Sequence, residues 1–306
     1  MSVSASDEAP RAQEDLAFRD AVTFSFGDPA MKVFGLARVG IGGGGAGASG
    51  FAVVYSDGDL AGASTDSSEV ARDVDMWEAI SAAGVRSTVE VPLEAWTVAY
   101  EGDEAGFDLR FEALSAPAAL DSEDAGARIG GTAGYEQLCS VTGSVQIGER
   151  SLGVRCLGQR GHLWGTPDWG RIELARTLTA WLGADRAVTL TAVRPAKAKH
   201  HDEEVVAGFV FEAGAPLAIF DARLSTTYDG ELRQRRAGLE LWMQEEGGFA
   251  RRAVGEALCG TTLELGDLRL DSAFFAWRME GREGTGRYDV LRRISDGSGR
   301  GSRRRR

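Results

Sequence analysis

The chain has 306 residues and a net charge of −12, with 43% hydrophobic and 26% charged residues, which is an ordinary globular balance. Its 41 glycines follow no three-residue period, which excludes collagen, and no apolar run approaches the ~20 residues of a membrane-spanning helix. An acidic body repels phosphate backbones, so no nucleic-acid binding is expected of it. Composition therefore predicts a soluble globular protein without a membrane span.

The two ends of the chain differ in character. Residues 1–18 are polar, predict a mobile N-terminus and lack the features of a signal peptide, so we expect a cytoplasmic protein. Residues 1–130 hold 8 basic and 23 acidic side chains, and residues 131–306 hold 26 and 23. The last ten residues, 297–306, include five arginines and predict a disordered tail that either aids solubility or contacts RNA or anionic lipid.

The first half of the chain alternates short apolar stretches with glycine or Asp-Gly turns, and several stretches have the period of two that predicts strands. The run 40–50 is rich in glycine but has no lysine and precedes a strand-like segment, so it predicts a hairpin loop and not a nucleotide-binding loop. Segment 68–84 has apolar residues at helical spacing and favours a helix. The strand-like stretches are 22–26, 31–39, 51–55, 85–91, 96–100 and 107–111.

The second half also alternates short apolar stretches with glycine-rich turns. Segment 172–182 fits a helix or a strand, and a strand is favoured. Strands at about ten-residue spacing with glycine-rich turns predict an all-β antiparallel sandwich or barrel with little helix. The strand-like stretches are 143–147, 186–193, 205–211, 217–226, 239–243 and 273–279.

The densest cluster of chemically useful side chains lies at 158–169. On a strand, Arg160, His162 and Trp164 share one face, and His162 is the natural proton donor or acceptor near neutral pH. Asp168 is the third candidate catalytic residue. The alternative is a structural corner in which Arg160 pairs with Asp168 and His162 bonds to backbone.

Three further residues are candidates for substrate binding beside Trp164. Trp169 is expected to shape an apolar pocket with Trp164, and both suit cation–π contact. Tyr135 and Glu136 fit the mouth of that pocket, where apolar surroundings would raise the pKa of Glu136 and make it an acid. The alternative for this pair is the start of a surface strand.

Residues 135–137, 141–145 and 158–169 resemble a bacterial family of unknown function, whose segment runs Tyr-Glu-Gln, a glycine-rich strand and Gly-x-Arg-Asp-His-Ser-Trp-Gly-x-Arg-Asp-Trp. Residues 284–289 loosely resemble its closing Gly-x-Gly-x-x-Glu-Tyr element. That family is similar to hydroxyneurosporene synthase, a carotenoid hydratase, and to lipocalin-like Diels–Alderases.

The resemblance implies tandem lipocalin-like, calycin-like antiparallel β-barrels with an apolar pocket. The expected domains are 19–134 and 135–296, between the mobile residues 1–18 and the tail 297–306. This chain departs from the motif at Gly161, Leu163 and Pro167, where the family has Asp, Ser and Arg. A missing Asp at position 161 weakens an inherited activity.

We therefore expect a cofactor-independent hydratase, isomerase or cyclase that acts by acid–base catalysis on a lipophilic terpenoid or polyketide-like molecule. His162 would transfer the proton and Arg160 would polarise an oxygen. The alternative is a carrier that binds a lipophile without chemistry, which Gly161 favours. A third class is a structural or interaction protein that uses its acidic N-terminal half.

Neither a metal nor a disulfide is expected. The run His-His-Asp-Glu-Glu at 200–204 places adjacent histidines on opposite faces of a strand, so it predicts a solvated hairpin loop and not a metal site. Cys139, Cys156 and Cys259 are odd in number and widely spaced, which fits buried thiols in a reducing compartment.

Overall fold

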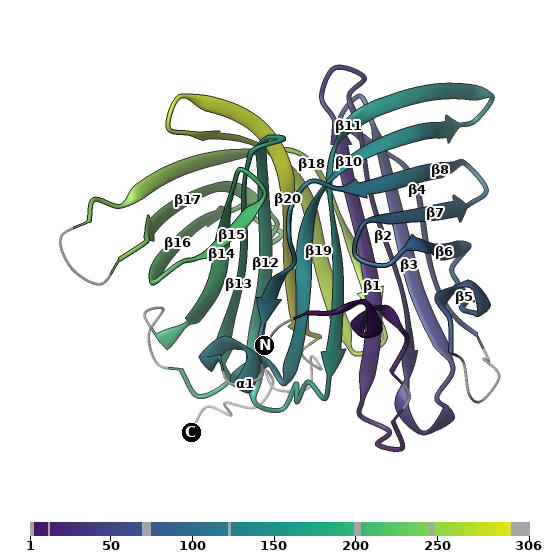
Figure 1. The fold of residues 1–306 in the computed structure, drawn as a ribbon, viewed down its shortest axis with the longest axis horizontal. Helices are drawn as coiled ribbons and strands as arrows, with labels where there is room; N and C mark the ends of the chain where they lie inside the picture. The colour runs from purple at the N-terminus through teal and green to yellow at the C-terminus, as the bar shows by residue number, and fades with distance from the viewer. Residues whose placement is uncertain are drawn as a thin grey trace, which may run out of the picture.

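The structure is a computed structural model that describes residues 3–11, 13–68, 75–121, 124–198, 203–244 and 248–294. Within these ranges, antiparallel strands form two curled sheets that lie side by side (Figure 1). Helix is confined to α1 (Ala125–Gly130) and the short 3-10 turns Ala5–Glu8, Gly43–Gly45 and Trp77–Ala79 in the described residues. The predicted all-β antiparallel class with little helix is confirmed.

The first sheet contains eleven strands in the part of the chain that the structure describes. Their bounds are β1 (Arg19–Asp28), β2 (Val33–Gly42), β3 (Ala48–Ser56), β4 (Asp59–Ser68), β5 (Ser81–Ala82), β6 (Val85–Val91), β7 (Ala95–Glu101), β8 (Ala105–Ala113), β9 (Ala118–Leu120), β10 (Thr132–Ile147) and β11 (Arg150–Gly165). Their order is β4-β3-β2-β1-β11-β10-β8-β7-β6-β5, and β9 pairs with β10. The sheet curls until β5 contacts β3 and β4, so it forms a nearly closed barrel.

The second sheet contains nine strands within the described ranges. Their bounds are β12 (Ile172–Gly183), β13 (Arg186–Pro195), β14 (Val205–Glu212), β15 (Ala215–Ala218), β16 (Asp221–Tyr228), β17 (Gln234–Trp242), β18 (Arg251–Leu265), β19 (Leu268–Met279) and β20 (Arg282–Arg293). Their order is β15-β14-β13-β12-β20-β19-β18-β17-β16, and contacts between β14 and β16 curl this sheet in the same way.

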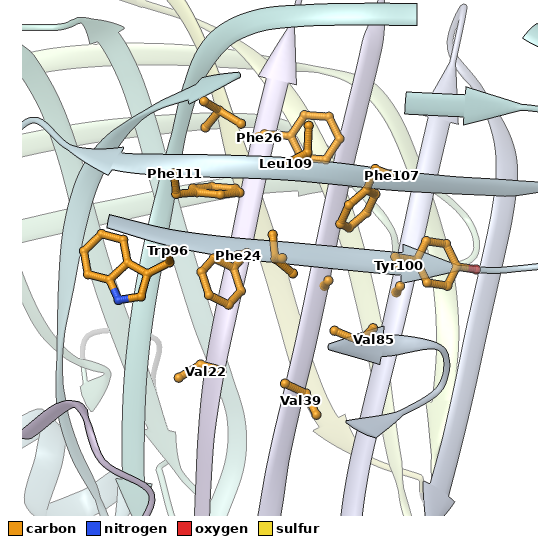
Figure 2. Packing of buried hydrophobic residues seen from close by; sticks show 14 of the residues in the cluster. Val22, Phe24, Phe26, Val39, Val85, Trp96, Tyr100, Phe107, Leu109 and Phe111 are labelled. Atoms are coloured by element: carbon orange, nitrogen blue, oxygen red, sulfur yellow. The ribbon is translucent and has the colours of Figure 1, made fainter. Parts of the chain in front are cut away.

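Each sheet has its own core because successive side chains on a strand point to opposite faces. In the first sheet, Phe24 and Phe111 pack edge to face, 5.2 Å between ring centroids, and Trp96 lies beside them (Figure 2). The opposite faces of the two sheets meet in a third apolar cluster, in which Phe34 of β2 contacts Phe274 of β19. Strands β2 and β3 thus have an interior face and an inter-sheet face.

The chain divides at a different place from the one expected. Residue 134 lies inside β10, and the long hairpin of β10 and β11 belongs to the first sheet, because β11 pairs with β1. The change of sheet falls between Gly165 and Ile172. The predicted boundary was placed at the start of the family motif, which lies in this hairpin. It therefore falls about thirty residues before the change of sheet.

The N-terminal residues also differ from expectation. Residues 3–11 were expected to be mobile, but the 3-10 turn Ala5–Glu8 places the Glu8 side chain inside the first sheet, where it is buried. No local pattern marks this, because the stabilising partner of Glu8 lies 152 residues away. The tail 297–306 lies outside the described residues.

Most local predictions are confirmed. The stretch 107–111 lies in β8, and the favoured strand 172–182 is β12. The glycine run 40–50 forms the hairpin of β2 and β3, with its loop at 43–47. The helix favoured for 68–84 is wrong for its described part, which holds only the turn Trp77–Ala79 and the short β5. There the apolar spacing reflects separate burial of Trp77 and Ile80 in the first core.

Candidate functional site

Arg160 points into the interior of the first sheet and is fully buried. Its Nη1 donates to Oε1 of Glu8 at 3.0 Å and its Nη2 donates to Oε2 at 2.6 Å, which makes a bidentate ion pair. Nη1 also donates to the hydroxyl of Tyr135 at 2.8 Å, and the guanidinium carbon lies 4.7 Å from the ring centroid of Trp96. The Arg160 charge is therefore neutralised by another part of the chain.

His162 lies two residues further along the same face and is also fully buried. Its Nε2 is 2.7 Å from Oδ1 of Asp20 on β1, and its Nδ1 has no hydrogen-bond partner. The rings of Trp77, Tyr135 and Trp164 surround the imidazole, with centroids 5.0–5.7 Å away. The predicted shared face of Arg160, His162 and Trp164 is thus present, but neither Arg160 nor His162 lines the two cavities described below.

Asp168 is not brought to His162. It is exposed in the loop after β11, where its Oδ1 accepts the Gly170 backbone N–H at 2.9 Å and its carbonyl oxygen accepts the Arg171 N–H. These are the bonds of a turn-forming aspartate. Trp169 is half-buried in the same loop. The alternative pairing of Arg160 with Asp168 is also absent, because Arg160 pairs with Glu8.

Glu136 and Gln159 lie on the other face of β10 and β11, which faces the second sheet. The Glu136 carboxylate accepts a hydrogen bond from Nε2 of Gln159 at 2.5 Å and another from the hydroxyl of Thr189 on β13. Burial raises the pKa of Glu136, against the opposing effects of the Arg287 charge and these two hydrogen bonds. The position of Glu136 between the two sheets therefore accounts for its raised pKa.

A small apolar hollow of about 20 Å³ adjoins Glu136. Its walls come from the first sheet and from β13 and β14 of the second. They are formed by Ala118, Leu120, Tyr135, Glu136, Leu163, Thr189, Thr191, Ala207, Gly208 and Phe209. A carboxyl group with apolar neighbours is the environment that keeps an acid protonated near neutral pH.

Two arginines lie on the same inter-sheet face. Burial lowers the pKa of Arg38 on β2 to about 10, and the like charges of Arg19 and Arg287 act in the same direction while Asp20 opposes them. Among the described residues, the Arg38 guanidinium forms no hydrogen bond or ion pair. Arg287 on β20 has its Nε 3.3 Å from Oδ2 of Asp289. Burial also raises the pKa of Asp289.

Gly161 completes this face. A Cβ at this position would lie 3.4 Å from Cγ of Glu136, which is close to ordinary van der Waals contact. An aspartate at this position would therefore stand directly beside Glu136.

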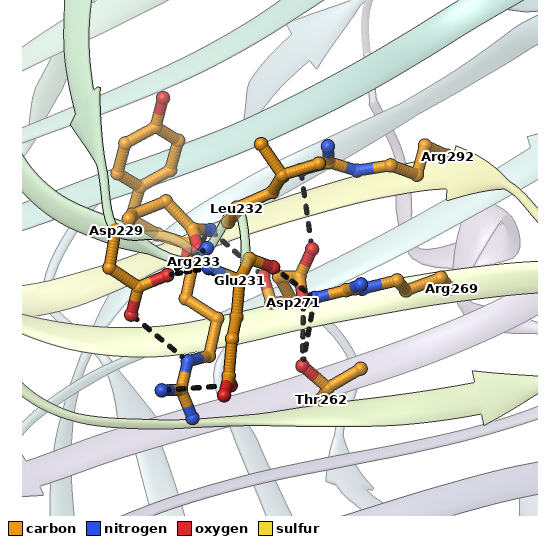
Figure 3. A network of polar contacts seen from close by, with 10 residues as sticks. Asp229, Glu231, Leu232, Arg233, Thr262, Arg269, Asp271 and Arg292 are labelled. Carbon is orange, nitrogen blue, oxygen red and sulfur yellow. Dashed lines mark hydrogen bonds and ion pairs between the residues drawn. The ribbon is translucent and has the colours of Figure 1, made fainter.

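A second, larger hollow of about 190 Å³ opens on the second sheet, where the lining residue Asp229 is paired with Arg233. The hydrogen bond from the Arg233 backbone N–H is the main cause that lowers the pKa of Asp229 at its rim. Next to it, the buried Asp271 accepts from Thr262 at 2.6 Å and from Arg269 at 2.9 Å, and Arg292 lies 3.2 Å away (Figure 3). This network joins β18, β19 and β20.

The sequence did not indicate Arg38 or Arg287 as site residues. Arg38 lies between apolar residues of β2, where the period of two predicts only that it shares a face with Phe34 and Leu36. A polar residue on the apolar inter-sheet face of a central strand was the available signal.

No group of three or more His, Cys, Asp or Glu side chains in the described residues has the arrangement of a metal site, and His200, His201 and Asp202 lie outside those residues. No helix in the described ranges combines the length and apolarity needed to cross a membrane.

Solved structures share this fold at low sequence identity. Kievitone hydratase from Nectria haematococca has a TM-score of 0.66 at 10% identity over 94% of this chain and 91% of its own. An AttH protein from Nitrosomonas europaea has a TM-score of 0.66 at 10% identity, over 90% and 92%. CghA, in a structure with Sch210972, has a TM-score of 0.65 at 12% identity, over 92% and 89%.

The family of the chain follows from its sequence. No curated protein matches it by sequence. The model of the domain of unknown function DUF7064 matches residues 4–294, which is nearly the whole chain. The chain belongs to the DUF7064 family.

Proposed function

We propose that the protein is an enzyme that transforms a lipophilic small molecule at the inter-sheet face, with Glu136 as the proton donor and acceptor. The observation that carries this proposal is the raised pKa of Glu136, which burial causes, beside an apolar hollow. An acid whose pKa is raised toward neutral holds a proton that it can deliver to a substrate. This moves the acid–base role from His162, whose Nε2 bonds to Asp20, to Glu136.

The nearby arginines suit a substrate with a conjugated carbonyl group. The charge of Arg287 acts on both Glu136 and Arg38, so all three belong to one electrostatic environment. A half-buried guanidinium with no carboxylate partner among the described residues, such as Arg38, can stabilise negative charge that develops on a carbonyl oxygen. The apolar walls suit the hydrocarbon part of the same molecule.

In the hydration of such a substrate, Glu136 acts as both the proton donor and the proton acceptor. Water adds its oxygen to the β-carbon, and the electron pair of the C=C bond moves to give an enolate whose oxygen faces Arg38. Glu136 gives its proton to the α-carbon, and the proton released by the added water returns to the Glu136 carboxylate. The net change is the addition of one water across the double bond.

Binding requires movement, because the hollow of about 20 Å³ is far smaller than the ~300–1,000 Å³ of typical ligand sites. The facing side chains of β11 and β14, Leu163 and Phe209, line the hollow from opposite sheets and would have to separate. Two proteins of the same fold support small-molecule chemistry here: one is named kievitone hydratase, and the CghA structure holds Sch210972.

The test uses lipophilic conjugated ketones, chalcone and β-ionone, in water enriched in oxygen-18. Mass spectrometry follows label incorporation for the native protein, for Glu136→Gln and for Glu149→Gln, which changes an exposed glutamate of the β10–β11 turn. We expect labelled product from the native protein, a loss of about 100-fold or more in Glu136→Gln, and no change in Glu149→Gln.

Binding without turnover in all three proteins would instead support the carrier alternative. Equal turnover in Glu136→Gln and the native protein would contradict the role of Glu136. Native mass spectrometry of the purified protein, searched for a bound lipophile, separates a carrier from a protein with no small-molecule ligand.

A further inference from the structure

The N-terminal segment 3–11 enters the first sheet through a single side chain. Glu8 is the one buried residue in this segment, and its neighbours Ser4, Ala5, Ser6 and Ala9 are exposed. The Glu8 carboxylate accepts four hydrogen bonds: two from Arg160, one from Nε1 of Trp96 at 3.2 Å and one from the Leu93 N–H at 3.1 Å. Such a set of converging donors is a complete receptor for a carboxylate.

The walls around this receptor are aromatic. Arg160 lies over the rings of Trp96 and Tyr135, with its guanidinium carbon 4.7 and 5.1 Å from their centroids. Trp77 and Trp164 continue the wall past His162, whose buried Nδ1 has no partner. Aromatic walls with a guanidinium at one end suit an organic carboxylate that carries an aromatic or alkyl body.

We propose that this cup, formed by Arg160, Trp96, Tyr135 and the Leu93 N–H, is a binding site for a small apolar carboxylate. Glu8 is its intramolecular occupant. A charged ligand that replaces Glu8 restores the ion pair with Arg160, so the exchange avoids the large cost of leaving a buried arginine without a partner. The apolar body of the ligand adds contacts that the glutamate side chain does not make.

The segment has few other attachments to the sheet. Nε1 of Trp77 donates to the Glu8 carbonyl oxygen at 2.6 Å, and the Arg11 N–H donates to Oδ2 of Asp20 at 2.6 Å. The Arg11 guanidinium lies 3.7 Å from the ring centroid of Trp164. Release of Glu8 would therefore expose the bond after Arg11 to a protease.

The groups that hold the carboxylate in this site are separate from Glu136, although Tyr135 also lines the hollow beside Glu136. Arg160 and Tyr135 point into the first sheet, whereas Glu136 and Gln159 point from the same strands toward the second sheet. Loss of turnover in Glu136→Gln therefore leaves carboxylate binding unaffected, and failure of one proposal does not decide the other.

The first experiment uses the full chain and 3-phenylpropionate, with 3-phenylpropanol as the uncharged control. Mass spectrometry measures the rate of trypsin cleavage after Arg11, and a synthetic peptide of residues 1–18 controls for effects on trypsin. We expect 3-phenylpropionate to accelerate cleavage several-fold and saturably, and 3-phenylpropanol to leave it unchanged. An unchanged rate with 3-phenylpropionate up to its solubility limit overturns the proposal.

The second experiment removes the Glu8 carboxylate from the cup. Calorimetry compares 3-phenylpropionate binding to the native protein, to Glu8→Ala and to Glu14→Ala, which removes an exposed acid of the same N-terminal region. Removing the internal competitor should tighten binding about tenfold or more in Glu8→Ala only. Equal affinity in the three proteins places the ligand elsewhere and overturns the proposal. Should Glu8→Ala not fold, the protease experiment decides alone.

Discussion

The two faces of the β10–β11 hairpin carry charged side chains in contrasting states. On the interior face, Arg160 is paired with Glu8 and His162 with Asp20. On the inter-sheet face, burial raises the pKa of Glu136, and the Arg38 guanidinium has no described partner. The ion pair of Arg160 with Glu8 stabilises the interior face, whereas on the inter-sheet face the raised pKa of Glu136 marks a candidate for proton transfer.

The largest effect is expected from breaking the interior pair. Arg160→Met leaves the Glu8 carboxylate without its charge partner, so the free energy of unfolding should fall by about 3–5 kcal/mol. Urea denaturation measures this. The control is Arg155→Met, which changes an exposed arginine of the same strand and should alter stability by less than about 0.5 kcal/mol. If both variants lost a similar free energy of unfolding, the buried ion pair of Arg160 and Glu8 would not be a special source of stability.

A smaller effect is expected from adding a charge to the inter-sheet face. Gly161→Asp places a second carboxylate beside Glu136 without a new partner, which should lower stability by about 1–3 kcal/mol at neutral pH. The repulsion also raises the pKa of Glu136 further, so the loss should shrink in acid. Gly153→Asp is the control, because a Cβ at this exposed glycine of β11 meets no atom within 4 Å. Equal losses in the two variants would contradict the buried position of Gly161.

The smallest expected effect is the pH dependence of stability that Glu136 causes. Because burial raises the pKa of Glu136 in the folded protein, folding favours its protonated form. The native protein should therefore be most stable, relative to Glu136→Gln, below the unfolded pKa of about 4.5, and should lose this advantage as pH rises through the folded pKa. The raised pKa of Asp289 is present in both proteins and cancels to first order.

Melting temperatures of the two proteins between about pH 4 and 8 measure this difference. A native protein that gains stability relative to Glu136→Gln as pH rises would show that the carboxyl group is stabilised as an anion, and would exclude it as a proton donor.

Local pattern was enough for much of the fold and for part of the site. The period of two located most of the strands and put Arg160, His162 and Trp164 on one face. For Glu136 the sequence left open an acid with a raised pKa or the start of a surface strand, and burial raises its pKa in the structure. The partners of the cluster could not be found in this way, because Glu8 and Asp20 lie 152 and 142 residues from Arg160 and His162. Such pairs depend on sheet topology, which strand periodicity does not specify.

The pairing of β1 with β11 also has a consequence for synthesis of the chain. Arg19 pairs with Gly165, so the edge of β1 remains open until about 140 further residues have left the ribosome. At ~5–20 residues per second this takes on the order of ten seconds, during which an apolar strand has an unpaired edge. Folding dominated by such distant pairings is slow, and the nascent first half of this chain should depend on chaperones more than its finished form.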